Sequence, residues 1–495
     1  MTTTTTDVRI YSVRTYHGVR EDTYNLRWRV AGRTFCKTYK LKSEAVRHGA
    51  ELSEAARLGV PFDIYAGLPI TVVAQQIAET TWYDHAVAFV DMKWPTLQPG
   101  SRRCLATALA SVTLAMTSQQ RRRPDPELCI KALLNWSFNR TARTAGDPPP
   151  KYAEAIAWVR THSLKVGALN NPQTLRSAFN ATLIAPDGKI YAAITHRNRL
   201  KVLSGAIRYA IELGLLERNP LERISTPLPR TTKVVDRRVV VNPEQARKLI
   251  AAVNNIAGGR GPRYAAYFAT IYYAGLRPGE VLALRAQDCT LPEQGWGELC
   301  FGESAPYVGG AWTDDGSNGP RKSLKHRTAN ESRTVPAHPE LVAHLRNHIE
   351  QFGTAPDGRL FASADGQDVK YSSFSQIWSQ ARKVALTKDQ FNSPLGKRPY
   401  DLRHACVSTW LNAGVSAPQI AEWAGHSVQM LLSTYAKCID GQYDRERRRI
   451  EEALRSEPSK PEHIATPCSA RGLGRSRLPG HRRVSAASGK SQLTA

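Results

Sequence analysis

The sequence predicts a multidomain α+β protein: a small N-terminal β-sheet with a helix, an all-helical middle region, and a mixed, mainly helical C-terminal region with a small antiparallel sheet. Three observations predict this class. Apolar residues alternate with polar ones near the N-terminus, which is the period of a half-buried strand. They recur at helical spacing through the middle of the chain. Residues 221–240 are basic, contain proline and lack periodicity, which is typical of a domain boundary.

Length and charge restrict the number of domains and the class of partner. At 495 residues the chain is long enough for about three domains of roughly 100–200 residues each. Its formal net charge of +25 favours a polyanionic partner, with nucleic acid the leading candidate and a membrane surface the other. The longest uncharged apolar-rich run, 264–276, is too short to span a bilayer, so we expect no membrane partner.

Cysteine usage and the N-terminus indicate the compartment. The eight cysteines contain no C-x-x-C pair, which argues against a disulfide framework or a zinc site and fits a reducing cytosol. The first residues have neither the basic nor the apolar region of a secretory signal. The sequence contains no P-loop and no cluster of acidic ligands. We therefore expect a cytoplasmic, nucleoid-associated protein without a metal or cofactor.

Residues 1–65 predict a small sheet followed by a helix. After a threonine run at 1–6, which we expect to be disordered, residues 24–30 alternate as a strand, Ala31-Gly32 forms a turn, and 33–39 pairs back. Ser43 is expected to cap a helix. The residues expected on its inner face are Ala45, Val46, Ala50, Leu52 and Ala55. Arg27 and Arg29 then share the outer sheet face, and Lys37 is a candidate neighbour.

Residues 75–220 are predicted to be helical, after a linker or short helix near 61–74. The expected helices include 101–116, 126–140, 150–164 and 191–216, with a turn near 185–188. Trp136 and Trp158 are expected in the core of this region.

Residues 241–455 are predicted to form a third unit, followed by a disordered basic tail at 456–495. Asn242 and Pro243 start a helix with Ala246, Leu249 and Val253 on its inner face. Short strands are expected at 299–301 and 307–312, and a hairpin at 322–336 whose return strand is 332–336. The expected helices are 264–273, a helix opened by 277–280, 338–351, 371–387, 401–413, 416–424 and 427–436.

Four residues in this unit have the chemistry of strand transfer through a phosphotyrosine. Arg277 and Arg403 each offer a planar fork of donors that fits two phosphate oxygens and neutralises charge in a transition state. His426 can donate to a phosphate oxygen. The hydroxyl of Tyr435, nine residues after His426, can attack phosphorus and store the bond energy covalently.

These motifs resemble the tyrosine recombinases, the phage-integrase family. The matching boxes are GLRPGE at 275–280, YDLR at 400–403, GH at 425–426 and Tyr435, in the family's order and at its spacing. The resemblance implies an arm-type DNA-binding domain at 1–65, a core-binding domain at 75–220, a linker at 221–240 that crosses the DNA, and a catalytic domain at 241–455.

One position of the family's pattern is not fixed by the sequence, the lysine of the hairpin, and one departs from it, Tyr400. The family carries a general-acid lysine on a hairpin, for which Lys325 is the preferred candidate, with Lys322 and Arg327 as alternatives. Tyr400 stands where the family has histidine, and tyrosine is a poor base near neutral pH. Tyr400 as the nucleophile is rejected because it precedes Arg403. His404, beside Arg403, is assigned to helix packing.

The resemblance implies a site-specific DNA recombinase, an integrase of a phage or mobile element. Tyr435 would form a 3′-phosphotyrosine and release a 5′-hydroxyl. The implied partners are double-stranded DNA attachment sites and three further copies in a homotetramer, with a DNA-bending host factor and an excisionase as further candidates. Two alternatives stay open: relaxation of DNA in the manner of type IB topoisomerases, and a non-catalytic DNA-binding protein of the same fold.

Overall fold

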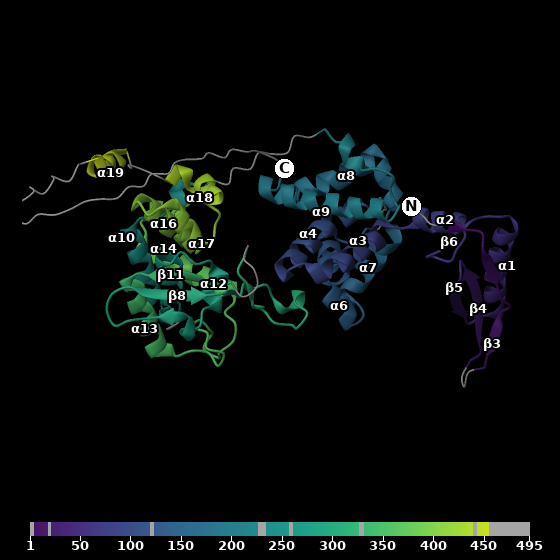
Figure 1. Cartoon of the computed structure of the whole chain (residues 1–495), viewed down its shortest axis with the longest axis horizontal. Helices are drawn as coiled ribbons and strands as arrows, with labels where there is room; N and C mark the ends of the chain where they lie inside the picture. The colour runs from purple at the N-terminus through teal and green to yellow at the C-terminus, as the bar shows by residue number, and fades with distance from the viewer. Residues whose placement is uncertain are drawn as a thin grey trace, which may run out of the picture. The chain divides into compact units, whose positions relative to one another are not determined.

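The computed structural model describes residues 4–17, 21–118, 123–225, 234–256, 261–325, 331–438 and 443–454, in two units that divide after Asp440. It is a mainly helical α+β protein with small antiparallel sheets, as predicted (Figure 1). Arg327 and the tail at 456–495 lie outside the described residues. Across the described ranges, no helix has the length and apolar character needed to cross a membrane.

The N-terminal sheet has four antiparallel strands with one helix packed on its apolar face (Figure 1). Strand β4 is central and pairs with the other three. The elements are β2 (Val8–Ile10), β3 (Arg14–Tyr16), β4 (Thr23–Val30), β5 (Arg33–Tyr39) and α1 (Lys42–Arg57). Leu26, Trp28 and Val30 alternate into a core with Leu52 and Phe62, so the period-2 pattern predicted the buried face correctly.

Several details of this region differ from the prediction. Helix α1 begins at Lys42 after Leu41, without a side-chain cap, so Ser43 lies inside the helix. Val46 is half exposed rather than on the inner face, and Ala50 is exposed as well. Lys37 pairs with Leu26 and so belongs to the face opposite Arg27. Within the threonine run, β1 (Thr4–Thr5) pairs with β6 (Phe62–Asp63).

The outer face of β4 is basic. Arg27 and Arg29 lie on it, and Arg9 is the cross-strand partner of Arg29. Both Arg9 and Arg27 place their guanidinium carbons within 6 Å of the Tyr11 ring, at 5.6 and 5.7 Å. The sheet therefore presents an arginine-rich surface that surrounds an aromatic ring.

The middle region is a bundle of helices around one apolar core, with Trp82, Phe89, Leu109 and Phe138 among its buried members. Trp136 and Trp158 are half-buried at its edge. The elements are α2 (Ile70–Glu79), α3 (Trp82–Lys93), η1 (Trp94–Thr96), α4 (Pro99–Ala115), α5 (Pro126–Ala132), η2 (Leu133–Ser137), α6 (Arg140–Ala145), α7 (Pro150–His162), η3 (Val166–Asn170), α8 (Pro172–Leu183), α9 (Ala193–Glu212) and η4 (Pro220–Arg223). The expected helix 126–140 is interrupted by a π turn at η2, and α8 lies in the stretch predicted to be helical although its bounds were not predicted.

A segment from the C-terminal region docks into this helical core. Trp312, in η7 (Gly310–Trp312), is buried in the helical cluster, with its ring centroid 6.2 Å from that of Trp94. Arg102, itself buried, donates to the Trp312 carbonyl at 3.1 Å and pairs with Asp314 at 2.8 Å. The prediction of a strand at 307–312 is wrong. The segment is irregular because its polar groups bond to the helices instead of to a sheet.

The C-terminal region contains a three-stranded sheet with the strand order β11-β8-β7. Its strands are β7 (Cys289–Thr290), β8 (Gly297–Phe301) and β11 (Arg333–Ala337), and a separate pair joins β9 (Glu303–Ser304) to β10 (Lys322–Ser323). The return strand was predicted at the right place, but it pairs with β8 rather than with residues near Lys322. The docked segment lies between β9 and β10 in the sequence, and these two strands pair with each other outside the three-stranded sheet.

Helices cover this sheet and supply most of the core (Figure 1). Their bounds are η5 (Arg237–Val239), α10 (Pro243–Asn254), α11 (Pro262–Tyr273), α12 (Pro278–Ala283), η6 (Ala286–Asp288), α13 (Pro339–Phe352), α14 (Tyr371–Ala385), α15 (Lys388–Asn392), α16 (Asp401–Asn412), α17 (Ala417–Ala424), α18 (Val428–Tyr435) and η8 (Ala436–Cys438), with α19 (Tyr443–Leu454) in the second unit. Asn242 caps α10 in a capping box with Gln245, and Ala246, Leu249 and Val253 are buried, as predicted.

Candidate active site

The four candidate site residues of the C-terminal region lie at or near the ends of helices. Arg277 stands immediately before α12, Arg403 lies in the first turn of α16, His426 lies between α17 and α18, and Tyr435 ends α18. A buried cluster that includes Val407, Leu431 and Tyr435 packs α16, α17 and α18 together. This packing brings residues that are far apart in the sequence into one site.

Arg277 is held by a carboxylate and a backbone carbonyl. Its Nη1 donates to Glu280 Oε1 at 2.7 Å and its Nη2 to the Gly425 carbonyl at 2.7 Å. Glu280 also accepts the backbone N–H of Arg277 at 2.8 Å, which caps α12. The Arg277 side chain remains 19 % exposed and has five N–H donors, so its fork keeps donors for an incoming anion.

Glu280 links Arg277 to a third arginine that the sequence analysis missed. Arg333, on β11, donates its Nη2 to Glu280 Oε2 at 2.7 Å, and both side chains are 1 % exposed. Burial alone would raise the pKa of Glu280, but the charges of Arg333, Arg403 and Arg277 outweigh it and lower the pKa to about 2. Glu280 is therefore ionised and fixes the two arginines on either side of it.

Arg403 is fully buried and bonds to backbone and histidine. Its Nη1 donates to the Gly275 carbonyl and its Nη2 to the Ala424 carbonyl. Its Nη2 also lies 3.0 Å from Nε2 of His426. Because a guanidinium can only donate, Nε2 of His426 is the acceptor and the imidazole proton is on Nδ1. Arg403 thus fixes the position and the tautomer of His426.

His426 is neutral and has an unused donor. Burial first, and then the charges of Arg403, Arg277 and Arg333, lower its pKa to about 3. Among the residues that the structure describes, neither Nδ1 of His426 nor Nε of Arg403 has a hydrogen-bond partner. A buried donor without an acceptor costs about 1–3 kcal/mol. Both groups therefore keep an N–H donor that is not used within the described part of the protein.

Gly425 permits the close approach of the arginines. Its φ of +60° is left-handed and ends α17. A Cβ at this position would lie 2.2 Å from Nη1 of Arg333 and 3.1 Å from Nη1 of Arg277. The glycine of the GH pair is therefore required by both its backbone angle and the packing of two guanidinium groups.

Tyr435 lies inside this cluster, with its hydroxyl bonded to a histidine. Its side chain is 1 % exposed, and its ring centroid is 6.3 Å from that of His426. Its Oη is 2.9 Å from Nδ1 of His404, on α16. Burial raises the pKa of the Tyr435 hydroxyl well above its usual value. The assignment of His404 to helix packing was therefore incomplete, because the side chain contacts the hydroxyl of Tyr435.

Tyr400 is one turn before His404 and packs against it edge-on, with ring centroids 5.1 Å apart. It is half-buried and immediately precedes α16. In the described structure it shapes the surroundings of His404. Among the described residues its hydroxyl makes no hydrogen bond to the arginines, and its role as a phosphate donor stays a prediction.

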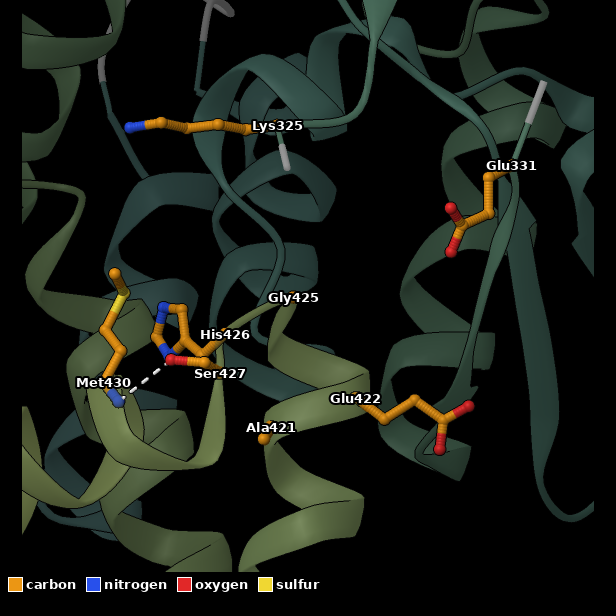
Figure 2. A pocket seen from close by; sticks show the side chains of 8 residues that line it. All are labelled: Lys325, Glu331, Ala421, Glu422, Gly425, His426, Ser427 and Met430. Atoms are coloured by element: carbon orange, nitrogen blue, oxygen red, sulfur yellow. Dashed lines mark hydrogen bonds between the residues drawn. The ribbon is translucent and has the colours of Figure 1, made fainter. Parts of the chain in front are cut away.

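A cleft of about 540 Å³ opens beside His426 (Figure 2). Lys325 and Met430 lie on the same side of it as the imidazole, and the carboxylates of Glu331 and Glu422 line the other side. Lys325 is exposed and lines this cleft, whereas Lys322, on β10, is half-buried. Of the described Asp, Glu, His and Cys side chains, no three are grouped so as to hold a metal ion.

One residue of the cluster, Arg333, was missed, and another, His404, was assigned only to helix packing. Arg333 belongs to a strand pattern of buried and exposed residues, and nothing in the sequence distinguishes it from a surface arginine. His404 had a usable indication: it follows Tyr400 by four residues and so lies on the same helix face, one turn further on.

The C-terminal region matches a known family. Residues 240–440 match the model of the phage integrase family. A protein named "Tyrosine recombinase XerC-like" from Caldanaerobacter subterraneus subsp. tengcongensis is 21% identical over 276 residues, which cover 51% of this chain and 66% of that protein.

Several solved structures of recombinases and integrases are also similar to this chain, at low sequence identity. The Tn1549 transposon integrase in complex with a circular intermediate DNA has a TM-score of 0.44 at 16% identity, covering 66% of this chain and 99% of that one. A lambda integrase tetramer bound to a Holliday junction has a TM-score of 0.40 at 13% identity, covering 83% and 95%. XerH recombinase bound to its difH substrate has a TM-score of 0.40 at 16% identity, covering 72% and 97%.

Proposed function

Residues 240–440 of this chain belong to the phage integrase family of tyrosine recombinases, and from this membership we propose that the protein is a site-specific DNA recombinase. In this proposal it integrates or excises a phage or mobile element. The observation that carries the proposal is the cluster itself. The ring of Tyr435 lies next to that of His426, with centroids 6.3 Å apart, and His426 is bonded to Arg403 and follows Gly425, whose carbonyl accepts a hydrogen bond from Arg277.

Tyr435 is the proposed nucleophile. Its Oη attacks the phosphorus of a DNA phosphodiester, a new P–O bond forms to the tyrosine, and the bond to the 5′-oxygen breaks. The product is a 3′-phosphotyrosine and a 5′-hydroxyl. Attack of a 5′-hydroxyl from the partner duplex reverses these bond changes on a new strand. The covalent link conserves the bond energy, so the step uses no nucleotide.

Arg277, His426 and Arg403 are the proposed phosphate-binding residues. The exposed part of the Arg277 fork and the unpartnered donors of His426 and Arg403 supply N–H groups fixed before the substrate binds. Donors already in place need no reorganisation when negative charge builds up on the phosphate oxygens. Loss of one such donor lowers a rate by about 10²–10³-fold in comparable sites.

Lys325 is the proposed general acid. Its ammonium can reach the cleft beside His426 and give a proton to the departing 5′-oxygen. Tyr400, in the position that holds histidine in the family, is proposed to donate a hydrogen bond near the phosphate.

The remaining parts of the chain are proposed to hold DNA. The basic outer face of β4, with Arg9, Arg27 and Arg29, would bind arm sites, and the helical bundle would bind the core site. We further propose that four copies assemble on two duplexes, with an excisionase and a DNA-bending host factor as further partners.

The proposal is tested by trapping the covalent intermediate. The probe is a library of nicked duplexes that tile the DNA flanking the gene. In a tile whose nick lies next to the position of cleavage, the short strand released by cleavage diffuses away and the adduct is trapped. We expect wild-type protein to form an adduct that survives denaturant on one tile, and Tyr435→Phe to form none. DNA binding by Tyr435→Phe, measured by gel shift, is the matched control.

The outcomes separate the alternatives. An adduct with Tyr435→Phe would remove Tyr435 from the chemistry. Binding without any adduct by wild type would favour a non-catalytic DNA-binding protein. Relaxation of supercoiled plasmid without site preference and without exchange of strands would favour the topoisomerase alternative.

A further inference from the structure

We propose that His404 is the base that accepts the phenolic proton of Tyr435 during strand cleavage. This inference rests on the proposed function, because it assigns a role within the same reaction. It departs from the sequence expectation, in which the first position of the YDLR box, Tyr400, was the candidate for the histidine's place.

The geometry of the contact carries the proposal. Nδ1 of His404 is 2.9 Å from Oη of Tyr435, within the range of a hydrogen bond between heavy atoms. Both residues are held by packing, since Tyr435 is buried in the cluster that joins α16 to α18, and the ring of Tyr400 packs edge-on against His404. The base and the nucleophile are therefore in contact before DNA binds, which is the arrangement that general-base catalysis needs.

The other histidine of the site is unsuited to this role. Nε2 of His426 already accepts a hydrogen bond from Arg403, and its Nδ1 carries the proton. His426 can therefore donate to a phosphate oxygen but has no free lone pair for the phenol. Tyr400 is a phenol itself and cannot deprotonate another phenol near neutral pH.

His404 is in the correct protonation state. Burial first, with the nearby Arg398 and Arg403 charges, lowers its pKa to about 4, against an opposing effect of Asp401. The imidazole is thus neutral at pH 7, and one of its nitrogens has a free lone pair. When the phosphate is attacked, the charge that leaves Tyr435 goes to the phosphorus centre, and the proton moves to Nδ1.

Two residues, His404 and Lys325, accept and supply the two protons that move in the reaction. In cleavage the O–H bond of Tyr435 breaks, the proton passes to His404, and Lys325 supplies the proton that the 5′-oxygen takes as it leaves. In ligation the steps reverse: Lys325 takes the proton of the attacking 5′-hydroxyl and His404 returns its proton to Tyr435. Asp401, whose charge favours protonated His404, stabilises the intermediate state.

The test separates base from acid catalysis. The duplex that gives the wild-type adduct is made in two forms, one with an ordinary 5′-oxygen and one with a 5′-bridging sulfur, which leaves without a proton. We expect His404→Asn and Lys325→Ala each to slow single-turnover cleavage of the oxygen substrate by about 10²-fold or more. The sulfur substrate should restore the rate of Lys325→Ala and leave His404→Asn slow.

The outcomes are distinguishable from failure of the proposed function. If wild type forms no adduct on any duplex, the proposed function fails. If wild type cleaves and His404→Asn cleaves equally fast, or is fully restored by the sulfur substrate, His404 is not the base. Thermal melting and gel shift verify that His404→Asn folds and binds DNA. If it does not fold, His404→Gln replaces it in the same two assays.

Discussion

Gly425 shows how one residue without a side chain sets the spacing of three charged ones. Its carbonyl accepts from Arg277, and the space where a Cβ would stand is occupied by the guanidinium of Arg333. The carboxylate of Glu280 then joins the two arginines from the other side. The geometry of the site therefore depends on a backbone position as much as on its charged side chains.

Gly425→Ala should lose both stability and activity. The left-handed angle costs an L-residue about 1–2 kcal/mol, and the new methyl group must displace Arg333 or Arg277. We expect the single-turnover cleavage rate of the folded fraction to fall by at least about 10-fold, because loss of a fixed donor can lower a rate by about 10²-fold. This loss would be additional to any loss of folded protein. Single-turnover cleavage and urea unfolding measure the two effects.

The matched control is Gly59→Ala. Gly59 has a φ of +72° but open space around an added Cβ. It should show the backbone cost without any loss of cleavage. Equal behaviour of the two variants would contradict the packing argument for Gly425.

The two site histidines predict how stability depends on pH. His404 and His426 have folded-state pKa values of about 4 and about 3, below the ordinary 6.5. The unfolded chain therefore binds more protons between these values, so stability is fully present above about pH 6.5 and is lost as the pH falls towards 4. The loss at about pH 5 should be on the order of 1–2 kcal/mol for each imidazole.

Urea unfolding at about pH 7 and pH 5 measures this dependence. The double variant His404→Asn, His426→Asn should have a flatter pH profile than wild type, because the two depressed pKa values are gone. Parallel profiles for the two proteins would show that other groups control the acid sensitivity.

At the scale of elements, the strand β11 serves the site as well as the core. Val335 and Ala337 are buried in the C-terminal core, and Arg333, two residues before Val335, reaches Glu280 while its guanidinium lies 4.8 Å from the centroid of the Phe301 ring. The pairing of β11 with β8 fixes this register, since Arg333 stands opposite Phe301. The register of the sheet thus positions a buried charge next to the start of α12.

Arg333→Met should destabilise the protein by about 3–5 kcal/mol, because it removes one partner of a buried ion pair and leaves Glu280 undercompensated. The methionine keeps much of the apolar contact with Phe301. Adding Glu280→Gln should recover part of the loss, since the uncompensated charge is then removed. Urea unfolding of both single variants and the double variant gives the coupling energy, and strictly additive losses would contradict this account.

At the scale of the whole molecule, the docked segment around Trp312 connects two regions that are distant in sequence. It belongs to the connection between β8 and β11, and this same connection carries Lys322 and Lys325 after it returns. Arg102 and Asp314 close the contact with an ion pair that has one buried partner. The connection that carries the candidate general acid is therefore the same one that packs against the helical bundle.

Trp312→Ala should release this segment. Removing a buried tryptophan costs about 3–5 kcal/mol where the site cannot collapse, so the backbone near Trp312 should lose protection from hydrogen exchange. Trp296→Ala is the control, because Trp296 is 63 % exposed and belongs to the same C-terminal region. Unchanged exchange near Gly310 in Trp312→Ala would show that the docking is energetically unimportant.

The sequence patterns predicted the regular strands and helices correctly but did not predict the irregular segments. The alternation of 24–30 and the cap at Asn242 gave β4 and α10 correctly, because local propensity and burial agree there. The interruption of the helix at η2 and the docking of η7 depend on contacts with distant residues, which a local sequence pattern does not contain. Lys37 was a candidate neighbour of Arg27 and Arg29, but the pairing register places it opposite Leu26 and so on the other face of the sheet.

By itself, the sequence determined the order and spacing of Arg277, Arg403, His426 and Tyr435, since these are local motifs that resemble a family, and it determined the basic character of the chain. The tertiary structure alone decided the contacts among them. It placed Arg333 on Glu280 and the His404 nitrogen on the Tyr435 hydroxyl. The physical reason is that helix and strand periods fix which face a residue occupies, whereas packing between elements decides what that face meets.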